Sequence, residues 1–210
     1  MDPKKRSVGA AERDEWLRAA WRLLFAASVD AGRLVFVDEM GSNTSLTPLY
    51  AWSRRGERAL CSAPRNWGAN VTLLASMDAG GMGPCLAVEG STTKEVFEAY
   101  LEQVLAPSLE SGQIVVMDNL SSHKGPRVRE LIEQRGCKLM YLPSYSPDLN
   151  PIEEAFAKLK ALLRRIGART LETLVEAMGR ALGAVTASDA RGFFEHSGYC
   201  ATAHLLCQAL

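Results

Sequence analysis

The 210-residue sequence lacks the features that mark disulfide-linked, secreted and membrane proteins. Its five cysteines are an odd number and no two of them have CxxC spacing, which argues against a disulfide framework and fits a reducing compartment. No stretch reaches the roughly 18 uninterrupted apolar residues that a membrane helix needs. The charged residues 1–7 are followed by no apolar run, which argues against a signal peptide. We therefore expect a cytoplasmic protein that does not enter a membrane.

The sequence also has no excess of either charge. Lys+Arg and Asp+Glu both number 24, so the formal net charge is zero. This balance weighs slightly against a nucleic-acid partner, but the distribution of charge matters more than its sum, and the distribution is uneven here. Apolar residues make up 47% of the chain, enough for a sizeable core, and the length fits one domain with at most a short appendage.

Five short segments have the apolar pattern of strands. Two of them, residues 34–38 and 114–118, are continuous apolar runs that end in an acid, which is typical of strands buried on both faces. A glycine-rich turn at 78–84 separates two others. The predicted strands cover residues 34–38, 71–77, 85–89, 114–118 and 138–142.

Helical spacing of apolar residues marks the segments between and around these strands. A first helix before residue 31 has an apolar stripe of Trp16, Leu17, Ala20, Leu23 and Leu24. The other predicted helices cover residues 92–105, 127–134, 152–166 and 170–187, and the chain is weakly patterned from 188 onward. Residues 41–70 predict an irregular hairpin or a long loop. This order indicates an α/β fold in which helices pack on a mixed sheet.

Asp38 and Asp118 each follow a predicted buried strand, where open α/β sheets place their ligands. A buried unpaired carboxylate pays a large desolvation penalty, and a bound cation removes that cost. Mg²⁺ prefers hard oxygen ligands and usually takes one or two carboxylates per ion. For either acid alone a turn or a helix cap is the simpler explanation, but two such strand ends together favour a metal site.

Glu153 is the third candidate acid. Asn150 suits an N-cap and Pro151 suits the first helical position, so Glu153 falls at the third position of a helix. A Glu at that position can fold back on the cap, which is a purely structural alternative. The partial positive charge of a helix N-terminus also favours the ionised carboxylate that a metal needs.

Three blocks of the sequence resemble the DDE transposase domain of the mariner-type superfamily, most closely its bacterial insertion-sequence branch. The blocks are Val37-Asp-Glu-Met-Gly41, Val116-Met-Asp-Asn-Leu-Ser-Ser-His123 and Tyr145-Ser-Pro-Asp-Leu-Asn-Pro-Ile-Glu153. The last block is specific, whereas the first alone is weak. Between Asp118 and Glu153 lie 34 residues, the spacing of that superfamily. The resemblance covers about residues 30–195.

The resemblance implies a ribonuclease H-like fold and a DNA transposase that cleaves and transfers strands in cut-and-paste transposition. It implies that Asp38, Asp118 and Glu153 are catalytic and hold Mg²⁺ or Mn²⁺. Two ions about 3.5–4 Å apart can activate a water or a DNA 3′-hydroxyl and stabilise the leaving oxygen, without a covalent protein intermediate. This chemistry fits the absence of an obvious Ser-His or Cys-His arrangement.

Other polar residues are candidates for contacts with DNA. Asn119 and His123 match the second block and could position DNA or a metal-bound water; the alternative is a turn with a solvent-exposed histidine. Two basic groups suit a DNA backbone, the first of them beside Trp52 and Trp67, which suit unstacked bases. A solvated loop and a charged outer helix face are the alternatives. The two groups are Arg54, Arg55, Arg58 and Arg65, and Lys158, Lys160, Arg164 and Arg165.

The resemblance also implies partners and parts. DNA, a homodimer on DNA and a helix-turn-helix recognition module are expected, but only about 30 residues precede Leu34, too few for that module. A separate helix-turn-helix half is therefore a candidate partner, and a decayed remnant that binds DNA or a partner without catalysis is the alternative. We expect a helical extension or linker at residues 1–31, the catalytic domain at 32–197 and a tail at 198–210.

Overall fold

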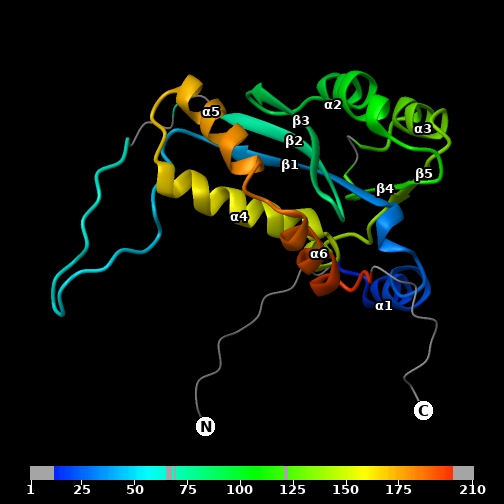
Figure 1. The fold of residues 1–210 in the computed structure, drawn as a ribbon, viewed down its shortest axis with the longest axis horizontal. Coiled ribbons are helices and arrows are strands. Elements are labelled where there is room, and N and C mark those ends of the chain that lie inside the picture. The colour runs from blue at the N-terminus through cyan, green and yellow to red at the C-terminus, as the bar shows by residue number, and fades with distance from the viewer. Residues whose placement is uncertain (1–11, 65–67, 69, 121–122, 201–210) are drawn as a thin grey trace, which may run out of the picture.

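The computed structural model describes residues 12–64, 68, 70–120 and 123–200. Its centre is a five-stranded sheet in the order β3-β2-β1-β4-β5 (Figure 1). Antiparallel pairing joins β1 to β2 and β2 to β3, and parallel pairing joins β1 to β4 and β4 to β5, so the predicted mixed sheet is confirmed. The strands are β1 (Leu34–Ser42), β2 (Val71–Asp78), β3 (Gly81–Glu89), β4 (Ile114–Met117) and β5 (Lys138–Tyr141).

Helices cover both faces of the sheet. Side chains alternate between the faces along each strand, so both faces carry apolar residues that helices bury. The helices α4, α5 and α6 pack on the face that carries Phe36 and Met40. The helices α2 and α3 pack on the opposite face, which carries Val35 and Val37. The α-helices are α1 (Glu15–Ala20), α2 (Lys94–Tyr100), α3 (Pro126–Glu133), α4 (Pro151–Ile166), α5 (Leu171–Leu182) and α6 (Ala187–His196). None of the helices in the described ranges is both long and apolar enough to span a membrane.

The strand β1 is longer than predicted, so Asp38 lies inside it and not at its end. Parallel pairing with β4 stops at Val37 opposite Met117, but antiparallel pairing with β2 continues to Ser42 opposite Val71. Asp38 therefore lies one residue beyond the end of the parallel half of the strand. The apolar pattern predicts only residues 34–38 of β1. The rest of the strand pairs with β2 alone, so it lacks the continuous apolar pattern of a central strand.

Two other boundaries differ from the sequence prediction. The turn between β2 and β3 is shorter than predicted, and β3 already begins at Gly81, whose φ of 135° suits glycine. The predicted helix at 170–187 ends at Leu182, and a new helix, α6, begins after Thr186. A capping box between Thr186 and Asp189 starts this helix. The segment with weak apolar pattern is thus helical, because local capping sets its start.

The first helical segment forms, but most of its apolar stripe is exposed. Trp16, Leu17, Leu23 and Leu24 are each more than half exposed. The buried side chains are instead Arg18 and Trp21, together with Ala26 at the end of the π-helix Trp21–Ala26 that continues α1. Tyr199 packs beside Trp21 and accepts a hydrogen bond from its indole at 2.8 Å. Both ends of the described chain thus contribute side chains to the same core.

An arm, residues 48–64, projects from the body between β1 and β2 (Figure 1). It contains no helix or strand and every residue in it is exposed, in agreement with the predicted loop. Arg169, which follows α4, donates to the carbonyl oxygens of Thr44 and Leu46 at 2.9 and 3.0 Å. These contacts fix the base of the arm against the body.

Candidate active site

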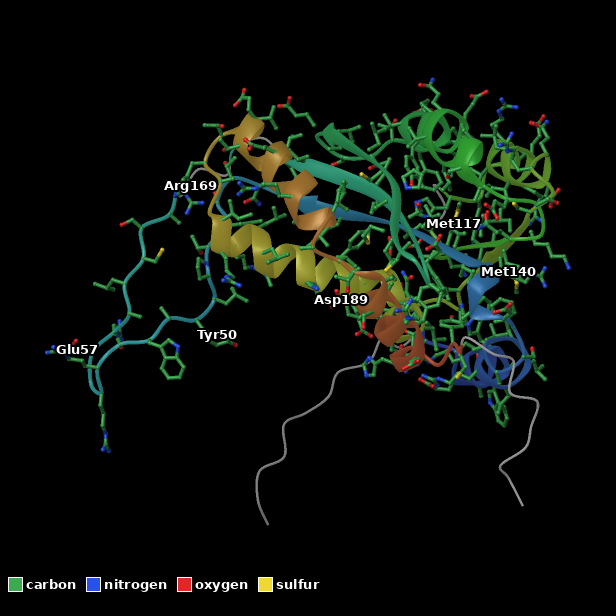
Figure 2. All side chains as sticks on the ribbon, in the orientation of Figure 1. Tyr50, Glu57, Met117, Met140, Arg169 and Asp189 are labelled. Carbon is green, nitrogen blue, oxygen red and sulfur yellow. The ribbon has the colours of Figure 1, made fainter. Side chains whose placement is uncertain are left out.

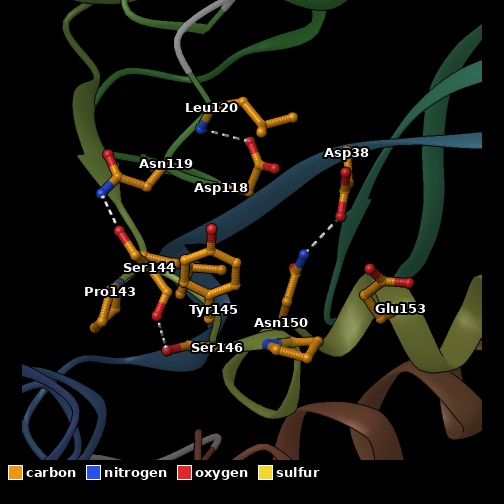
Figure 3. A pocket seen from close by; sticks show the side chains of 12 residues that line it. Asp38, Asp118, Asn119, Leu120, Pro143, Ser144, Tyr145, Ser146, Asn150 and Glu153 are labelled. Atoms are coloured by element: carbon orange, nitrogen blue, oxygen red, sulfur yellow. Dashed lines mark hydrogen bonds between the residues drawn. The ribbon is translucent and has the colours of Figure 1, made fainter. Parts of the chain in front are cut away.

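A cavity of about 370 Å³ opens where β1, the end of β4 and the start of α4 meet (Figure 3). Asp38, Asp118 and Glu153 all line this cavity. The rest of its wall comes mainly from the loop at 142–147 after β5 and from Asn119, Leu120 and Asn150. Three acids from three separate parts of the chain thus face one space, as the sequence predicts for their positions.

Asp38 points to the side of the sheet that α4 covers. It shares this face with Phe36 and Met40, because alternate side chains of a strand lie on one face. Its side chain is buried, and both carboxylate oxygens accept hydrogen bonds. Oδ1 accepts from the amide of Glu39 at 2.7 Å, and Oδ2 accepts from Nδ2 of Asn150 at 2.7 Å (Figure 3).

The surroundings of Asp38 disfavour its ionised form. Burial raises the pKa of Asp38 to about 7, although the hydrogen bond from the amide of Glu39 opposes this shift. The negative charges of Asp118 and Glu153 raise the pKa further. A cation bound beside Asp38 would stabilise its ionised form. The cation would replace the hydration that the buried carboxylate has lost and would offset the repulsion among the three acids.

Asp118 directly follows β4 and is held by His123. The carboxylate Oδ1 lies 2.5 Å from Nδ1 of His123, and a proton on that nitrogen makes the histidine the donor. The His123 ring is only 1% exposed and stacks on Phe97 at 4.1 Å. Its carbonyl accepts a hydrogen bond from the hydroxyl of Tyr141 at 2.8 Å. The alternative of a solvent-exposed histidine is therefore wrong, and the ring faces Asp118.

Two further residues shape the cavity wall. Asn119 donates from Nδ2 to Oγ of Ser144 at 2.9 Å, which ties the end of β4 to the loop after β5 (Figure 3). Tyr145, in that loop, has a φ of 54°, which is uncommon for an aromatic residue. Its side chain is 55% exposed. The third sequence block thus supplies part of the wall as well as an acid.

The start of α4 separates Glu153 from Glu154. Glu153 lies at the third helical position, on the flank that faces the cavity. Glu154 lies on the other flank, where its Oε1 is 2.6 Å from Nδ1 of His196 in α6, and this carboxylate raises the pKa of His196. The helical period alone leaves the two acids equivalent, and the packing of α6 distinguishes them.

The donor set of the cavity fits divalent cations with hard oxygen ligands. In the part of the chain that the structure describes, no three acidic, histidine or cysteine side chains are close enough to hold one ion. The three carboxylates surround the cavity instead. Mg²⁺ usually takes only one or two carboxylates, so a bound ion does not require all three acids in one cage.

The basic candidates of α4 divide between its two flanks. Lys160 and Arg164 follow Glu153 by seven and eleven residues, about two and three turns, so they share its flank. Lys158 lies on the other flank and pairs with Asp189 of α6 at 2.7 Å. Arg165 also lies away from the flank of Glu153.

The other basic candidates belong to a different region. Arg54, Arg55 and Arg58 lie on the exposed arm, which extends away from the body near Tyr50 and Glu57 (Figure 2). Arg65 lies outside the described residues. The seven basic candidates that the structure describes therefore do not form one continuous surface around the cavity.

A family model described as "DDE superfamily endonuclease" matches residues 33–175, a range that contains Asp38, Asp118 and Glu153. The chain belongs to this family. The family prediction from the three sequence blocks is thereby confirmed. The more specific likeness to a bacterial insertion-sequence branch stays a prediction.

Curated relatives and solved structures agree with this membership. The chain is 28% identical to the Tcb1 transposase of Caenorhabditis briggsae over 188 residues, which are 76% of this chain and 68% of the relative. The fold matches the Mos1 strand transfer complex with a TM-score of 0.71 and 18% identity, over 94% of this chain and 63% of that one. It matches the mariner Mos1 paired end complex with Mg with a TM-score of 0.70 and 16% identity, over 96% and 66%. This DDE family member thus spans about two thirds of these relatives, and its predicted ribonuclease H-like fold is confirmed.

Proposed function

We propose that this DDE family member is the catalytic domain of a cut-and-paste DNA transposase, with Asp38, Asp118 and Glu153 as ligands of two Mg²⁺ or Mn²⁺ ions. The observation that carries the proposal is the single cavity that all three acids line. Two further findings support it. The Tcb1 relative is a transposase, and Mos1 paired end complexes are known with Mg and with Mn.

The chain's own residues prepare the cavity for phosphodiester chemistry. Two bound ions supply activation of the attacking water or 3′-hydroxyl and stabilisation of the leaving oxygen. Asp38 and Asp118 offer oxygens whose orientation is fixed by hydrogen bonds to Asn150 and His123. Glu153 is exposed in the first turn of α4 and lines the same cavity. The three carboxylates would thus hold the cations in an open cavity that a DNA strand can approach.

Cation binding should depend strongly on pH. Because burial raises the pKa of Asp38 to about 7, protons compete with the cation at pH 6 but not at pH 8. We expect Mn²⁺ to raise the melting temperature at pH 8 and to raise it much less at pH 6, as scanning fluorimetry can measure. The double variant Asp38→Asn, Asp118→Asn should show no shift at either pH. A full shift in that variant would remove the proposed site.

DNA binding by this chain should be sequence-tolerant and depend steeply on salt, because phosphate contacts dominate. Lys160 and Arg164 are placed to make such contacts on the flank of Glu153. The double variant Lys160→Gln, Arg164→Gln should flatten the plot of log affinity against log salt by roughly 2, at about 0.9 per phosphate contact. Lys158→Gln is the matched control, since Lys158 already pairs with Asp189. An equal effect of the control would place the DNA elsewhere.

We also propose that the chain acts as a homodimer on DNA, with a helix-turn-helix module supplied by another part of the transposase. The arm supports association with a partner, because it exposes large apolar side chains that no other described residue covers: Leu49, Tyr50, Trp52 and Leu60. Exposed apolar groups of this size mark interaction surfaces when they cluster.

A further inference from the structure

Asn150 occupies the N-cap position of α4 but does not use its side chain as a cap. An N-cap asparagine normally accepts a hydrogen bond from an amide in the first helical turn. Here the side chain is 4% exposed, and its Oδ1 has no partner among the described residues. Its Nδ2 instead donates to Oδ2 of Asp38 at 2.7 Å (Figure 3). The amide is therefore directed at the acid and not at its own helix.

Chemistry fixes which end of the amide faces Asp38. In its ionised form, which is the form that binds a cation, Asp38 only accepts hydrogen bonds, so the NH₂ group of Asn150 and not its carbonyl must face it. The other oxygen of Asp38 accepts from the amide of Glu39. Each oxygen thus receives one hydrogen bond from the chain. Together these bonds fix the plane of the carboxylate and leave lone pairs on both oxygens for a cation.

The backbone before Asn150 is anchored by both ends of the described chain. The buried side chain of Arg18 donates to both oxygens of Asp148, at 2.9 and 2.6 Å. The hydroxyl of Tyr199 donates to the carbonyl of Leu149 at 2.8 Å. A bidentate charged pair of this kind has a defined geometry. The two residues before Asn150 are thus held in place, and with them the position of its amide.

We propose that Asn150 is a positioning residue that orients Asp38 to bind a divalent cation, an inference that rests on the proposed function. Asp118 is held in a comparable way by buried His123, whereas the carboxylate of Glu153 makes no hydrogen bond within the described ranges. Partners that orient a metal ligand typically change metal affinity by about 10–100-fold. If Asn150 served only as an N-cap, its side chain would accept a hydrogen bond from an amide at the start of α4, and it does not.

The variant Asn150→Ser separates positioning from capping. Serine is as good an N-cap as asparagine but is too short to reach Asp38. Thr170→Ala is the matched control, because Thr170 is the N-cap of α5 and does cap it with its side chain. We expect the Kd for Mn²⁺, measured on the metal-free full chain by electron paramagnetic resonance of free Mn²⁺, to rise about tenfold or more in Asn150→Ser. In Thr170→Ala it should stay unchanged while the melting temperature falls.

Each outcome of this experiment is decisive. If Asn150→Ser binds Mn²⁺ as tightly as the unsubstituted protein, the positioning role is wrong and the residue acts only in the helix start. If the serine variant does not fold, Asn150→Thr is a second variant that keeps a capping hydroxyl. Asp38→Asn tests the proposed function separately, since it should abolish tight binding. Unchanged binding in Asp38→Asn would remove the metal site, and the positioning role with it.

Discussion

The variant Glu153→Gln is expected to lose DNA strand cleavage by roughly 10³-fold or more. Glutamine keeps the size of the side chain and the start of α4, but it removes the charge that faces Asp38 and Asp118 across the cavity. Because the glutamate side chain is exposed and makes no hydrogen bond in the described parts of the chain, folding should change little. Cleavage is measured on a pre-nicked or transposon-end substrate, with a recognition half supplied in trans where needed.

The neighbouring acid provides the control. Glu154→Gln removes an ion pair with His196, whose side chain is 80% exposed, so stability should change little and most activity should remain. If the two variants behave the other way round, the assignment is wrong by one residue. Asp148 cannot replace Glu153 as the third metal ligand, because its carboxylate accepts hydrogen bonds from Arg18 and Arg22. An unsubstituted protein that binds DNA and never cleaves it would favour the decayed-remnant alternative.

The sequence predicts the sheet because its strands depend on local signals. The run before Asp38 and the run before Asp118 are apolar on both faces, which happens only in central strands. The proline at position 151 suits the first helical position, and α4 begins at this residue. The helical period cannot choose between Glu153 and Glu154, because α6, which packs on one flank of α4, lies in a segment with weak apolar pattern; only the resemblance to the family block selects Glu153.

Other parts of the site depend on contacts between distant residues, which leave no local pattern. The ion pair of Arg18 with Asp148 joins positions 130 residues apart, and it buries a charge within a helix whose apolar stripe stays exposed. The amide of Asn150 reaches Asp38 over 112 residues. Asparagine is a common N-cap residue, so its presence before α4 does not reveal the contact with Asp38.

The second large effect is expected on the stability of the metal-free protein, and its sign is opposite to that of most substitutions of buried residues. Asp38→Asn should stabilise the metal-free protein at pH 8. The pKa of Asp38 is raised from 3.8 to about 7, so the folded state binds this proton more tightly than the unfolded state. Stability of the unsubstituted protein therefore falls as pH rises from about 4 to 7, and the penalty is complete above pH 7.

The size of this effect follows from the shift. At 1.36 kcal/mol per unit, the penalty on ionised Asp38 is at most about 4 kcal/mol. An asparagine cannot accept from both the amide of Glu39 and Nδ2 of Asn150, and losing one hydrogen bond costs about 1–2 kcal/mol. The net gain at pH 8 should be about 2 kcal/mol, or about 4–8 °C in melting temperature for a chain of this size. At pH 4, where the penalty is nearly absent, the variant should be less stable than the unsubstituted protein by the hydrogen bond that it loses.

Asp189→Asn is the control with the opposite sign. Its hydrogen bonds with Lys158 and Thr186 lower the pKa of Asp189, so its contribution to stability is present at neutral pH and is lost as the pH falls through the lowered pKa. Thermal unfolding of the metal-free variants from pH 4 to pH 8 should therefore show Asp38→Asn gaining stability, relative to the unsubstituted protein, as the pH rises. Asp189→Asn should be less stable than the unsubstituted protein by a nearly constant amount over the same range, because the contribution of Asp189 is lost only below the ordinary aspartate pKa of 3.8. Because Mn²⁺ at pH 8 stabilises only the protein that retains Asp38, it should reverse the order of Asp38→Asn and the unsubstituted chain. The opposite result would be a variant Asp38→Asn that is less stable than the unsubstituted protein at every pH, with or without Mn²⁺. In that case the carboxylate of Asp38 is a structural hydrogen-bond acceptor and not a cation ligand.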